Sequence, residues 1–174
     1  MPESDPKAGS ATPRPKHDTY CFLESAGNLF LWCTGGLFVR GAEKVPASGP
    51  VLLVSNHVSY LDPVSIGVAS PRRVVFMAKA ELFHNRLLGW LLDGVDCFPV
   101  RRGEADRAAF KNTLAMLADN RVVCIFPEGT RSVDGELHEA EPGAAIFALK
   151  TGAPVVPVFV EGTRHVLGAG RRLH

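Results

Sequence analysis

The sequence has 174 residues, of which 46% are hydrophobic and 21% are charged, and its formal net charge at pH 7 is +1. This length and composition are typical of one globular domain with a buried core. A charge so close to zero excludes the broad basic surface that binds nucleic acids, so we expect no nucleic-acid partner and only local anion sites.

The first 41 residues divide into two segments of different composition. Residues 1–17 are rich in Pro, Ser and charge and lack a signal-peptide pattern, which predicts a disordered tail. Residues 18–41 are apolar, and we expect a helix that ends near Arg40 and Gly41. Their longest uncharged stretch, residues 25–39, is shorter than the roughly 20 apolar residues that span a membrane. The helix therefore packs on the protein core or lies on a membrane surface, and this segment alone supports both interpretations.

After residue 41, short apolar runs alternate with helical patterns. We expect strands at residues 51–55, 74–78, 96–100, 122–126 and 155–160, and helices opening at Asp62 and covering 81–92, 104–119 and 142–150. Continuous apolar strands alternating with helices are typical of a mostly parallel sheet with helices on both faces. The prediction is a single α/β domain over residues 42–174, with functional residues on the loops after the strands.

The four cysteines are widely spaced and form no C-x-x-C pair. They are Cys21, Cys33, Cys97 and Cys124. We expect buried thiols in a reducing compartment, and neither disulfides nor a metal site.

The segment NHVSYLD, residues 56–62, follows the first expected strand and contains Asn56, His57 and Asp62. On one helix, residues five apart point about 140° away from each other. His57 and Asp62 meet if His57 lies on a loop and Asp62 caps the helix that begins with Pro63. A carboxylate on one imidazole nitrogen leaves the other nitrogen as a base. The alternative is a helix cap beside an incidental loop histidine.

A second polar segment, CIFPEGTRSVDGEL at residues 124–137, also follows an expected strand. Gly129 allows a ligand to approach the backbone, and Arg131 offers a planar fork for a phosphate or carboxylate. Glu128 either binds a hydroxyl or orients Arg131. Further hydrogen-bond donors are Thr130 and Ser132. The alternative is a polar turn with Glu128 and Arg131 paired on the surface.

Three more cations, Lys79, Arg101 and Arg102, directly follow expected strands. In a parallel sheet they lie at the same edge as His57 and Arg131. A base beside a cationic cluster suits a phosphate-bearing substrate with a hydroxyl to deprotonate. The alternative is a solvated basic rim.

These segments together resemble the glycerolipid acyltransferases, which include the lysophosphatidate acyltransferases. The matching stretches are SNHVSYLDP (55–63), MAKAELF (77–83) continuing to FPVRR (98–102), FPEGTRS (126–132) and GAPVVPVFVEGT (152–163). They occur in the family's order and cover most of residues 45–163. His-x4-Asp is a weak signal alone, but together with F-P-E-G-T-R-S it is specific.

The resemblance implies an enzyme that moves a fatty acyl group from acyl-CoA or acyl carrier protein to lysophosphatidate (1-acylglycerol-3-phosphate) in phospholipid synthesis. His57 would deprotonate the acceptor hydroxyl and Asp62 would orient His57. The residues that would bind the glycerol phosphate are Arg101, Glu128, Gly129, Thr130 and Arg131. Further candidates are Asn56, Lys79, Arg102, Ser132 and, on the acyl side, Pro154.

The resemblance implies no metal, no bound cofactor and no covalent acyl-enzyme. The family's members are usually membrane-bound, so residues 18–41 are expected to face a membrane, at its cytoplasmic side.

The chain departs from the family pattern at three places. Ala140 and Glu141 stand where the family commonly has an aromatic and a basic residue, and Asn85 stands where it often has Pro. The sequence given ends at His174, whereas family members usually continue through another strand, so the domain is expected to be C-terminally short. Two alternatives stay open: an acyltransferase for another lipid-pathway acceptor, and a non-catalytic membrane-associated module that binds lipid or acyl carrier.

Overall fold

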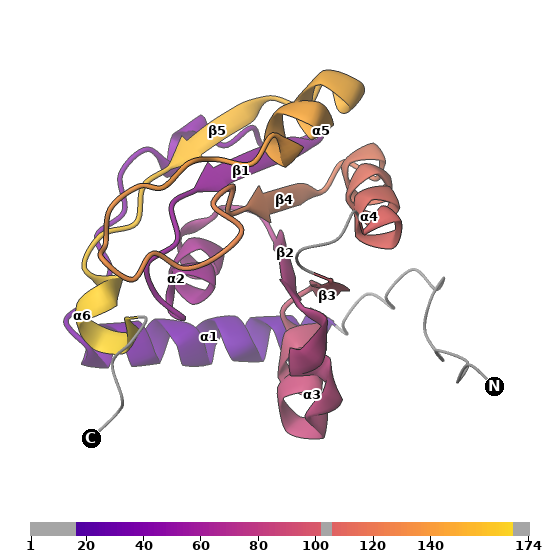
Figure 1. The fold of residues 1–174 in the computed structure, drawn as a ribbon. Coiled ribbons are helices and arrows are strands. Elements are labelled where there is room, and N and C mark those ends of the chain that lie inside the picture. The colour runs from indigo at the N-terminus through magenta and orange to yellow at the C-terminus, as the bar shows by residue number, and fades with distance from the viewer. Residues whose placement is uncertain (1–16, 102–105, 169–174) are drawn as a thin grey trace.

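Five parallel strands form the centre of the molecule, in the order β3-β2-β4-β1-β5 (Figure 1). The computed structural model describes residues 17–101 and 106–168. The strands are β1 (Val51–Ser55), β2 (Val74–Lys79), β3 (Cys97–Val100), β4 (Val122–Ile125) and β5 (Val155–Val158). The helices are α1 (His17–Cys33), α2 (Asp62–Ala69), α3 (Arg86–Gly94), α4 (Arg107–Ala118), α5 (Gly143–Thr151) and α6 (Thr163–Leu167), with 3-10 turns η1 (Ala42–Lys44) and η2 (Ala80–His84). The predicted α/β domain with a parallel sheet is confirmed.

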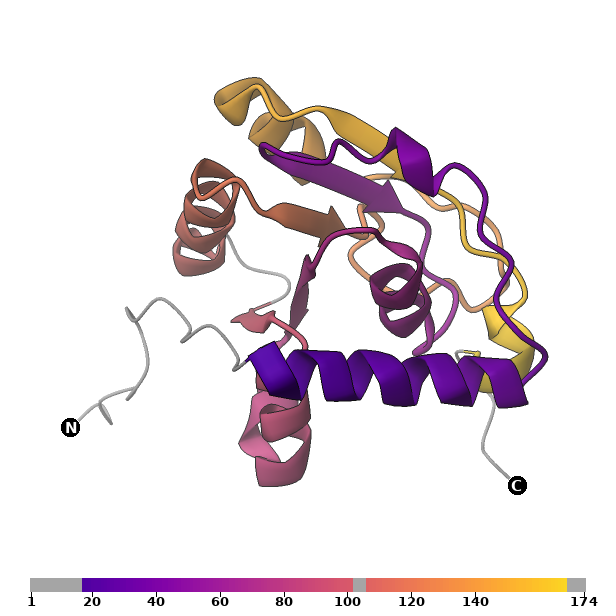
Figure 2. The same ribbon diagram turned by 180° about the vertical axis from the view of Figure 1, so that it is seen from behind.

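The core has two layers because side chains alternate between the faces of the sheet. On one face, Leu52 of β1 belongs to a buried cluster with Leu117 of α4 and Phe147 of α5. On the other face, Leu53 of β1 belongs to a cluster with Ile66 of α2. Helix α1 contacts α2 on this second side, and in the view from behind it runs below α2 (Figure 2). Both sheet faces are therefore covered, as the unbroken apolar strands predicted.

Helix α1 is shorter than the predicted apolar helix over residues 18–41. It ends at Cys33 because Gly35 and Gly36 take positive φ angles of 121° and 86°, and the N–H of Gly36 donates to the carbonyl of Leu31. The expected end at Arg40 and Gly41 is therefore wrong. Among the described residues, no helix has both the length and the apolar character needed to cross a bilayer. The expected tail falls almost entirely in residues 1–16, which lie outside the described residues.

The expected helix over 81–92 is divided into η2 and α3 at Asn85. The side chain of Asn85 accepts hydrogen bonds from the N–H groups of Leu87 and Leu88, so it caps α3. This departure from the family pattern has a local structural role. The start of the expected helix at 104 lies outside the described residues, and α4 begins after Asp106, whose side chain caps it in the same way.

Cys97 and Cys124 are buried as expected, whereas Cys21 is half-buried and Cys33 is exposed, so the expectation of buried thiols is wrong at those two positions. Burial raises the pKa of the Cys97 thiol to about 12, and burial also raises that of Cys124. We expect a thiol reagent at pH 8 to label Cys33 in the folded protein and to label Cys97 and Cys124 only after unfolding, because the thiolate is the reactive form. Mass spectrometry of labelled peptides measures this. Labelling of Cys97 as fast as Cys33 under native conditions would contradict the structure.

Candidate active site

The two polar segments meet because their strands are neighbours. Strands β1 and β4 pair directly and run parallel, with Val54 opposite Ile125. The loops after both strands therefore leave the sheet at the same edge. The loop after β1 carries His57, and the loop after β4 carries Glu128 and Arg131. The sheet order thus builds one site from segments that are far apart in the sequence.

His57 and Asp62 form a direct contact, as predicted. The Nδ1 atom of His57 lies 2.8 Å from Oδ2 of Asp62, and the two residues are 7% and 0% exposed. Oδ2 already accepts two backbone N–H groups, so the tautomer that fits is the one in which Nδ1 donates to Asp62. In that tautomer Nε2 is the nitrogen left for a base function. The prediction that His57 lies on a loop and Asp62 at the start of a helix is confirmed.

The predicted cap at Asp62 is wrong in one respect. Leu61 is the N-cap of α2, and Asp62 is the first residue of the helix. Its Oδ2 atom accepts the backbone N–H groups of Val58 and Ser59, at 2.7 and 2.8 Å, instead of N–H groups in α2. The loop therefore folds back over the carboxylate, which brings the His57 ring within reach.

The loop after β4 holds His57 through its backbone. Oε1 of Glu128 accepts the N–H of His57 at 3.2 Å, and the N–H of Ser132 donates to the carbonyl of His57 at 2.7 Å. The Phe126 ring stacks on the imidazole, with centroids 4.1 Å apart and planes at 20°. These contacts from one loop fix the position of His57 and leave little freedom for its ring.

Arg131 lies beside Tyr60 rather than beside Glu128. Its guanidinium carbon sits 3.5 Å from the centre of the Tyr60 ring, a cation–π stack. Within the described part of the chain, no ion pair joins Arg131 to Glu128, so the surface-pair interpretation is wrong. Nη1 of Arg131 and Oε2 of Glu128 are buried, and neither has a hydrogen-bond partner among the described residues. Unpartnered buried donors and acceptors are costly, which favours a polar ligand at this place.

Two of the candidate residues serve the fold instead. The side chain of Asn56 exchanges two hydrogen bonds with the backbone of Val160, at 2.8 and 2.7 Å, so both of its polar groups are used. The hydroxyl of Ser132 donates to Asp134 and accepts from the N–H of Gly135. Asn56 thus holds the loop after β1 to the segment after β5, and Ser132 stabilises the turn at residues 132–135.

The remaining candidate residues have no described contact with the His57–Asp62 pair. Lys79 ends β2 and pairs with Glu81 at 3.2 Å, and Thr130 is exposed on the loop. Pro154 precedes β5, so it lies at the amino edge of the sheet, opposite His57, and the structure does not bring it to the site. Arg102 lies outside the described residues.

A cavity of about 250 Å³ opens beside Gly129, in the loop after β4. Its walls come mainly from α4, α5 and the strand ends and include Phe110, Phe126 and Phe147. Its polar lining includes Arg101 and Glu141, and an added Cβ at Gly129 would lie 3.2 Å from the Glu141 carboxylate. Arg101 and Gly129 thus line the same cavity, as predicted. The carboxylate of Glu141 lies next to Gly129 in this cavity.

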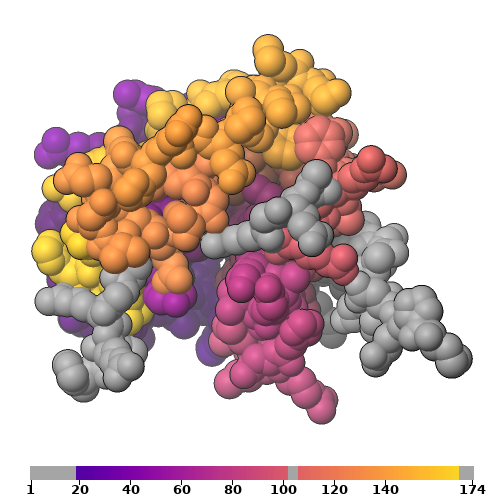
Figure 3. All heavy atoms as spheres, viewed as in Figure 1, coloured from indigo at the N-terminus to yellow at the C-terminus, as the bar shows by residue number. Residues whose placement is uncertain are grey.

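The loop between β4 and α5 is fixed at its far end. In the space-filling view it forms the orange surface that meets the yellow atoms of α6 (Figure 3). The guanidinium of Arg164 donates to the carbonyls of Asp134 and Val133. Hydrogen bonds from the Ser132 hydroxyl and the Glu136 N–H lower the pKa of Asp134 to about 2. The carboxylate therefore stays ionised and holds the loop at neutral pH.

Sequence reasoning missed three residues at the site: Phe126, Tyr60 and Thr163. Phe126 lies inside the second quoted motif, and Tyr60 lies between His57 and Asp62, so both positions carried a signal. Thr163 donates its hydroxyl to Oδ1 of Asp62 at 2.6 Å from 101 residues away in the chain. It is the last residue of the stretch 152–163, and its presence in that motif is the one sequence signal that could have identified it. Among the described residues, no group of three or more His, Cys, Asp or Glu side chains is arranged to hold a metal ion.

Comparisons with known proteins show the family of the chain. The family model described as Acyltransferase matches residues 36–161. A 1-acyl-sn-glycerol-3-phosphate acyltransferase of Bacillus subtilis is 32% identical over 144 residues, which cover 82% of this chain and 71% of that protein. A chloroplastic 1-acyl-sn-glycerol-3-phosphate acyltransferase of Brassica napus is 33% identical over 76% of this chain, but this chain spans only 39% of its length.

The fold is also similar to a solved structure. The crystal structure of the 1-acyl-sn-glycerophosphate (LPA) acyltransferase PlsC from Thermotoga maritima superimposes with a TM-score of 0.72 and 28% sequence identity. The match covers 87% of this chain and 61% of that one. The matched relatives thus include proteins considerably longer than this chain.

Proposed function

The chain belongs to the Acyltransferase family, and we propose that it transfers a fatty acyl group from a thioester to the free hydroxyl of lysophosphatidate, with His57 as the general base. The observation that carries the proposal is the buried His57–Asp62 pair beside a loop with two unpartnered polar atoms. An acyl donor on coenzyme A and one on acyl carrier protein present the same thioester to this site.

The proposed chemistry needs one base and no covalent intermediate on the enzyme. Nε2 of His57 takes the proton of the acceptor hydroxyl as the oxygen attacks the thioester carbonyl. The new C–O ester bond forms, the C–S bond breaks, and the imidazolium returns the proton to the leaving thiolate. Asp62 stabilises the imidazolium and holds the ring by Nδ1. Ser59 is not the nucleophile, because its hydroxyl donates to the carbonyl of Leu167.

The phosphate of the acceptor is proposed to bind at Arg131 and Arg101. A guanidinium presents a planar fork to phosphate oxygens, and the buried Nη1 of Arg131 has no partner in the described residues. Gly129 has a positive φ of 66° and no side chain to keep the acceptor from the backbone of the loop. Glu128 has one buried oxygen left for a hydroxyl of the glycerol.

The cavity between α4 and α5 is proposed to receive an acyl chain. Its aromatic walls offer apolar surface, and Phe126 connects it to the imidazole because this ring contacts both. The acyl side is therefore proposed at α4 and α5, and not at Pro154.

Glu141 favours a second candidate acceptor. Its carboxylate lies beside Gly129 and lines the same cavity as Arg101, so it opposes the positive charge there. An acceptor with a hydroxyl or amine and no phosphate, in the same reaction class, would avoid that repulsion.

The test is direct detection of the product. Purified protein is incubated with palmitoyl-CoA or palmitoyl acyl carrier protein and, separately, lysophosphatidate, monoacylglycerol or a lysophospholipid with an amine head group. We expect mass spectrometry to find phosphatidate as the main product. Acylation of monoacylglycerol or of the amine in preference would support the second acceptor, and lipid binding without product would support a non-catalytic module.

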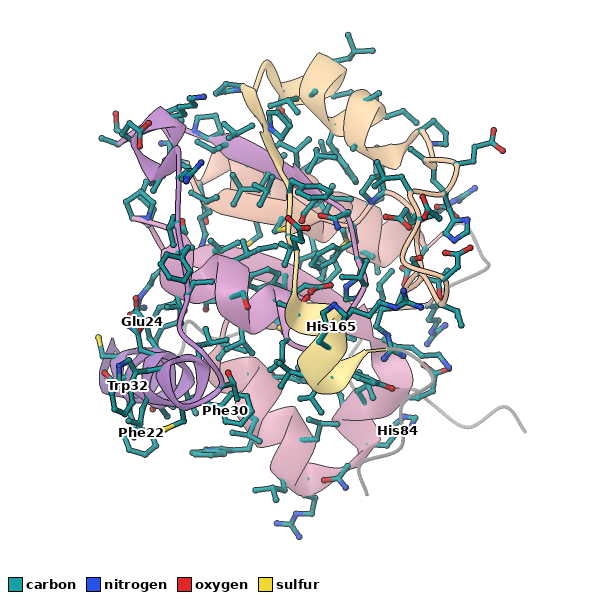
Figure 4. The ribbon with its side chains drawn as sticks, turned by 90° about the vertical axis from the view of Figure 1, so that its left-hand side faces the viewer. Phe22, Glu24, Phe30, Trp32, His84 and His165 are labelled. Atoms are coloured by element: carbon teal, nitrogen blue, oxygen red, sulfur yellow. The ribbon has the colours of Figure 1, made fainter. Side chains whose placement is uncertain are left out.

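Membrane contact is proposed through α1. Phe22 and Trp32 are 67% and 76% exposed, and in Figure 4, which looks along α1, they lie on the side of the helix away from the sheet. Aromatic side chains on an exposed helix face are typical of interfacial contact. Thioester donors and the free cysteines suit the cytoplasmic side of the membrane.

We expect the double substitution Phe22→Ser and Trp32→Ser to reduce co-sedimentation with phosphatidylglycerol vesicles by about tenfold, because two aromatic side chains lose their burial in the interface. Leu149→Ser, which changes an apolar residue on α5 that is 87% exposed, is the control and should bind as wild type. Unchanged binding of the double variant would place the membrane contact elsewhere.

A further inference from the structure

Asp62 is held from two directions, and only one of them belongs to its own loop. Its Oδ2 atom accepts three hydrogen bonds, from His57 Nδ1 and from the backbone N–H groups of Val58 and Ser59. Its Oδ1 atom accepts one, from the hydroxyl of Thr163 at 2.6 Å. Asp62 is fully buried and Thr163 is 8% exposed, so water does not replace this donor easily.

Thr163 is positioned by helix α6, and the opposite end of this helix is bonded to the loop after β1. It is the first residue of α6, directly after Gly162, which takes a positive φ of 84°. At the end of α6, the carbonyl of Leu167 accepts from the Ser59 hydroxyl at 2.8 Å and from the Tyr60 N–H at 3.2 Å. Figure 1 shows α6 at the end of the sheet beside the loop after β4. The Thr163 hydroxyl is therefore set against Asp62 by contacts on either side of it.

This hydroxyl fixes the rotation of the carboxylate. The terminal torsion of an Asp side chain is broad, and the two oxygens of the planar carboxylate turn together about it. The bond from Thr163 to Oδ1 therefore adds to the three bonds to Oδ2 in fixing this torsion. A buried carboxylate oxygen without a donor is also destabilised, which favours a rotated carboxylate that seeks other partners. A rotation of the carboxylate moves Oδ2 and takes the His57 ring with it.

We propose that Thr163 is a positioning residue for acyl transfer: it locks the Asp62 carboxylate in the orientation that binds Nδ1 of His57. The proposal rests on the proposed function of His57 as the base. Thr163 touches neither substrate nor the reacting atoms and acts through Asp62. It makes the proposed base depend on a segment at the far end of the described chain.

The kinetic test compares Thr163→Val, which keeps the shape and removes the hydroxyl, with Thr163→Ser, which restores it. We expect Thr163→Val to lower kcat for phosphatidate formation about 10- to 100-fold with both KM values unchanged, and Thr163→Ser to stay within about threefold of wild type. Thr151→Val is the matched control, because its hydroxyl makes a 2.7 Å bond to the carbonyl of Phe147 away from the site. An unchanged kcat in folded Thr163→Val would overturn the proposal.

A second substitution and a spectroscopic signal keep the test independent of folding and of substrate. If Thr163→Val does not fold, Thr163→Cys has a shape close to that of Thr163→Ser but only a weak donor, and we expect the same loss as for Thr163→Val. In an Asp62→Asn background, Thr163→Val should have no further effect on kcat, and an additive loss would show that Thr163 acts elsewhere.

The downfield NMR resonance of the His57 Nδ1 proton reports the bond to Asp62 directly. We expect it in wild type and Thr163→Ser, and we expect it weakened or lost in Thr163→Val. If wild type makes no phosphatidate, the proposed function fails, whereas this signal still tests the link from Thr163 to the pair. A signal that is identical in Thr163→Val would overturn the inference even in an active enzyme.

Discussion

His57→Ala is expected to lower kcat by about 10²- to 10⁴-fold, the usual contribution of a positioned general base. The physical reason is the contact of Nδ1 with Asp62 at 2.8 Å, which leaves Nε2 as the ring nitrogen for the proposed base. Without the imidazole, the hydroxyl has no base to take its proton. The measurement is the initial rate of phosphatidate formation at saturating concentrations of both substrates.

The same substitution also removes a buried ring that stacks on Phe126, so its effect on folding must be measured. We expect a loss of stability of about 1–3 kcal/mol, which leaves the protein folded by near-ultraviolet circular dichroism. His84→Ala is the matched control, because His84 is exposed on η2 and belongs to neither loop of the site (Figure 4). Near-normal turnover of folded His57→Ala would remove His57 from the mechanism.

Arg131→Ala is expected to raise KM for lysophosphatidate and to lower kcat/KM by a free energy of about 2–5 kcal/mol, as for a buried charged contact that loses one partner. Arg131 stacks on Tyr60 and keeps a buried Nη1 without a partner in the described chain. Arg131→Lys should recover only part of the loss, because an ammonium keeps the charge but has no planar fork.

The choice of acceptor separates a phosphate contact from a general loss of activity. With monoacylglycerol, which has the hydroxyl but no phosphate, Arg131→Ala should change KM little. Arg86→Ala, at the exposed start of α3, is the matched control. Equal losses with both acceptors, or an unchanged KM for lysophosphatidate, would show that Arg131 does not bind the phosphate.

Much of the fold follows from local patterns in the sequence. Each strand is an apolar run bounded by polar or turn residues, and each lies within a few residues of its predicted range. Burial on both faces requires that pattern in β1 and β4, whereas the edge strand β5 has the same apolar pattern but is partly exposed. The end of α1 was misplaced because the helix stops at Gly35 and Gly36, inside a segment whose apolar composition continues to Val39. Apolar composition predicted the presence of the helix, whereas its end is determined by the backbone conformation of the two glycines.

The site was predictable where chemistry lies within one segment and less so where it joins distant segments. The contact of His57 with Asp62 follows from a loop and a helix start five residues apart. The stack of Arg131 on Tyr60 and the bond of Thr163 to Asp62 depend on the neighbourhood of β1, β4 and β5, which the strand order decides. Such an order is a property of the packed sheet, and no spacing in the sequence encodes it.

Pro154 illustrates the same limit in the opposite direction. It was expected on the acyl side because of the motif in which it stands. A parallel strand has its carboxyl end at one edge of the sheet and its amino end at the other, and Pro154 precedes β5. The motif does not say which edge of the sheet Pro154 occupies, and its place relative to His57 became visible only in the folded sheet.

The central claim is that thioester cleavage requires both the acceptor hydroxyl and His57. It is tested most directly by measuring free thiol released from palmitoyl-CoA by wild type and by His57→Ala, each with and without lysophosphatidate. We expect fast release only from wild type with lysophosphatidate present. One equivalent of thiol released by wild type without the acceptor, or equal release by His57→Ala with it, would show that thioester cleavage does not require both.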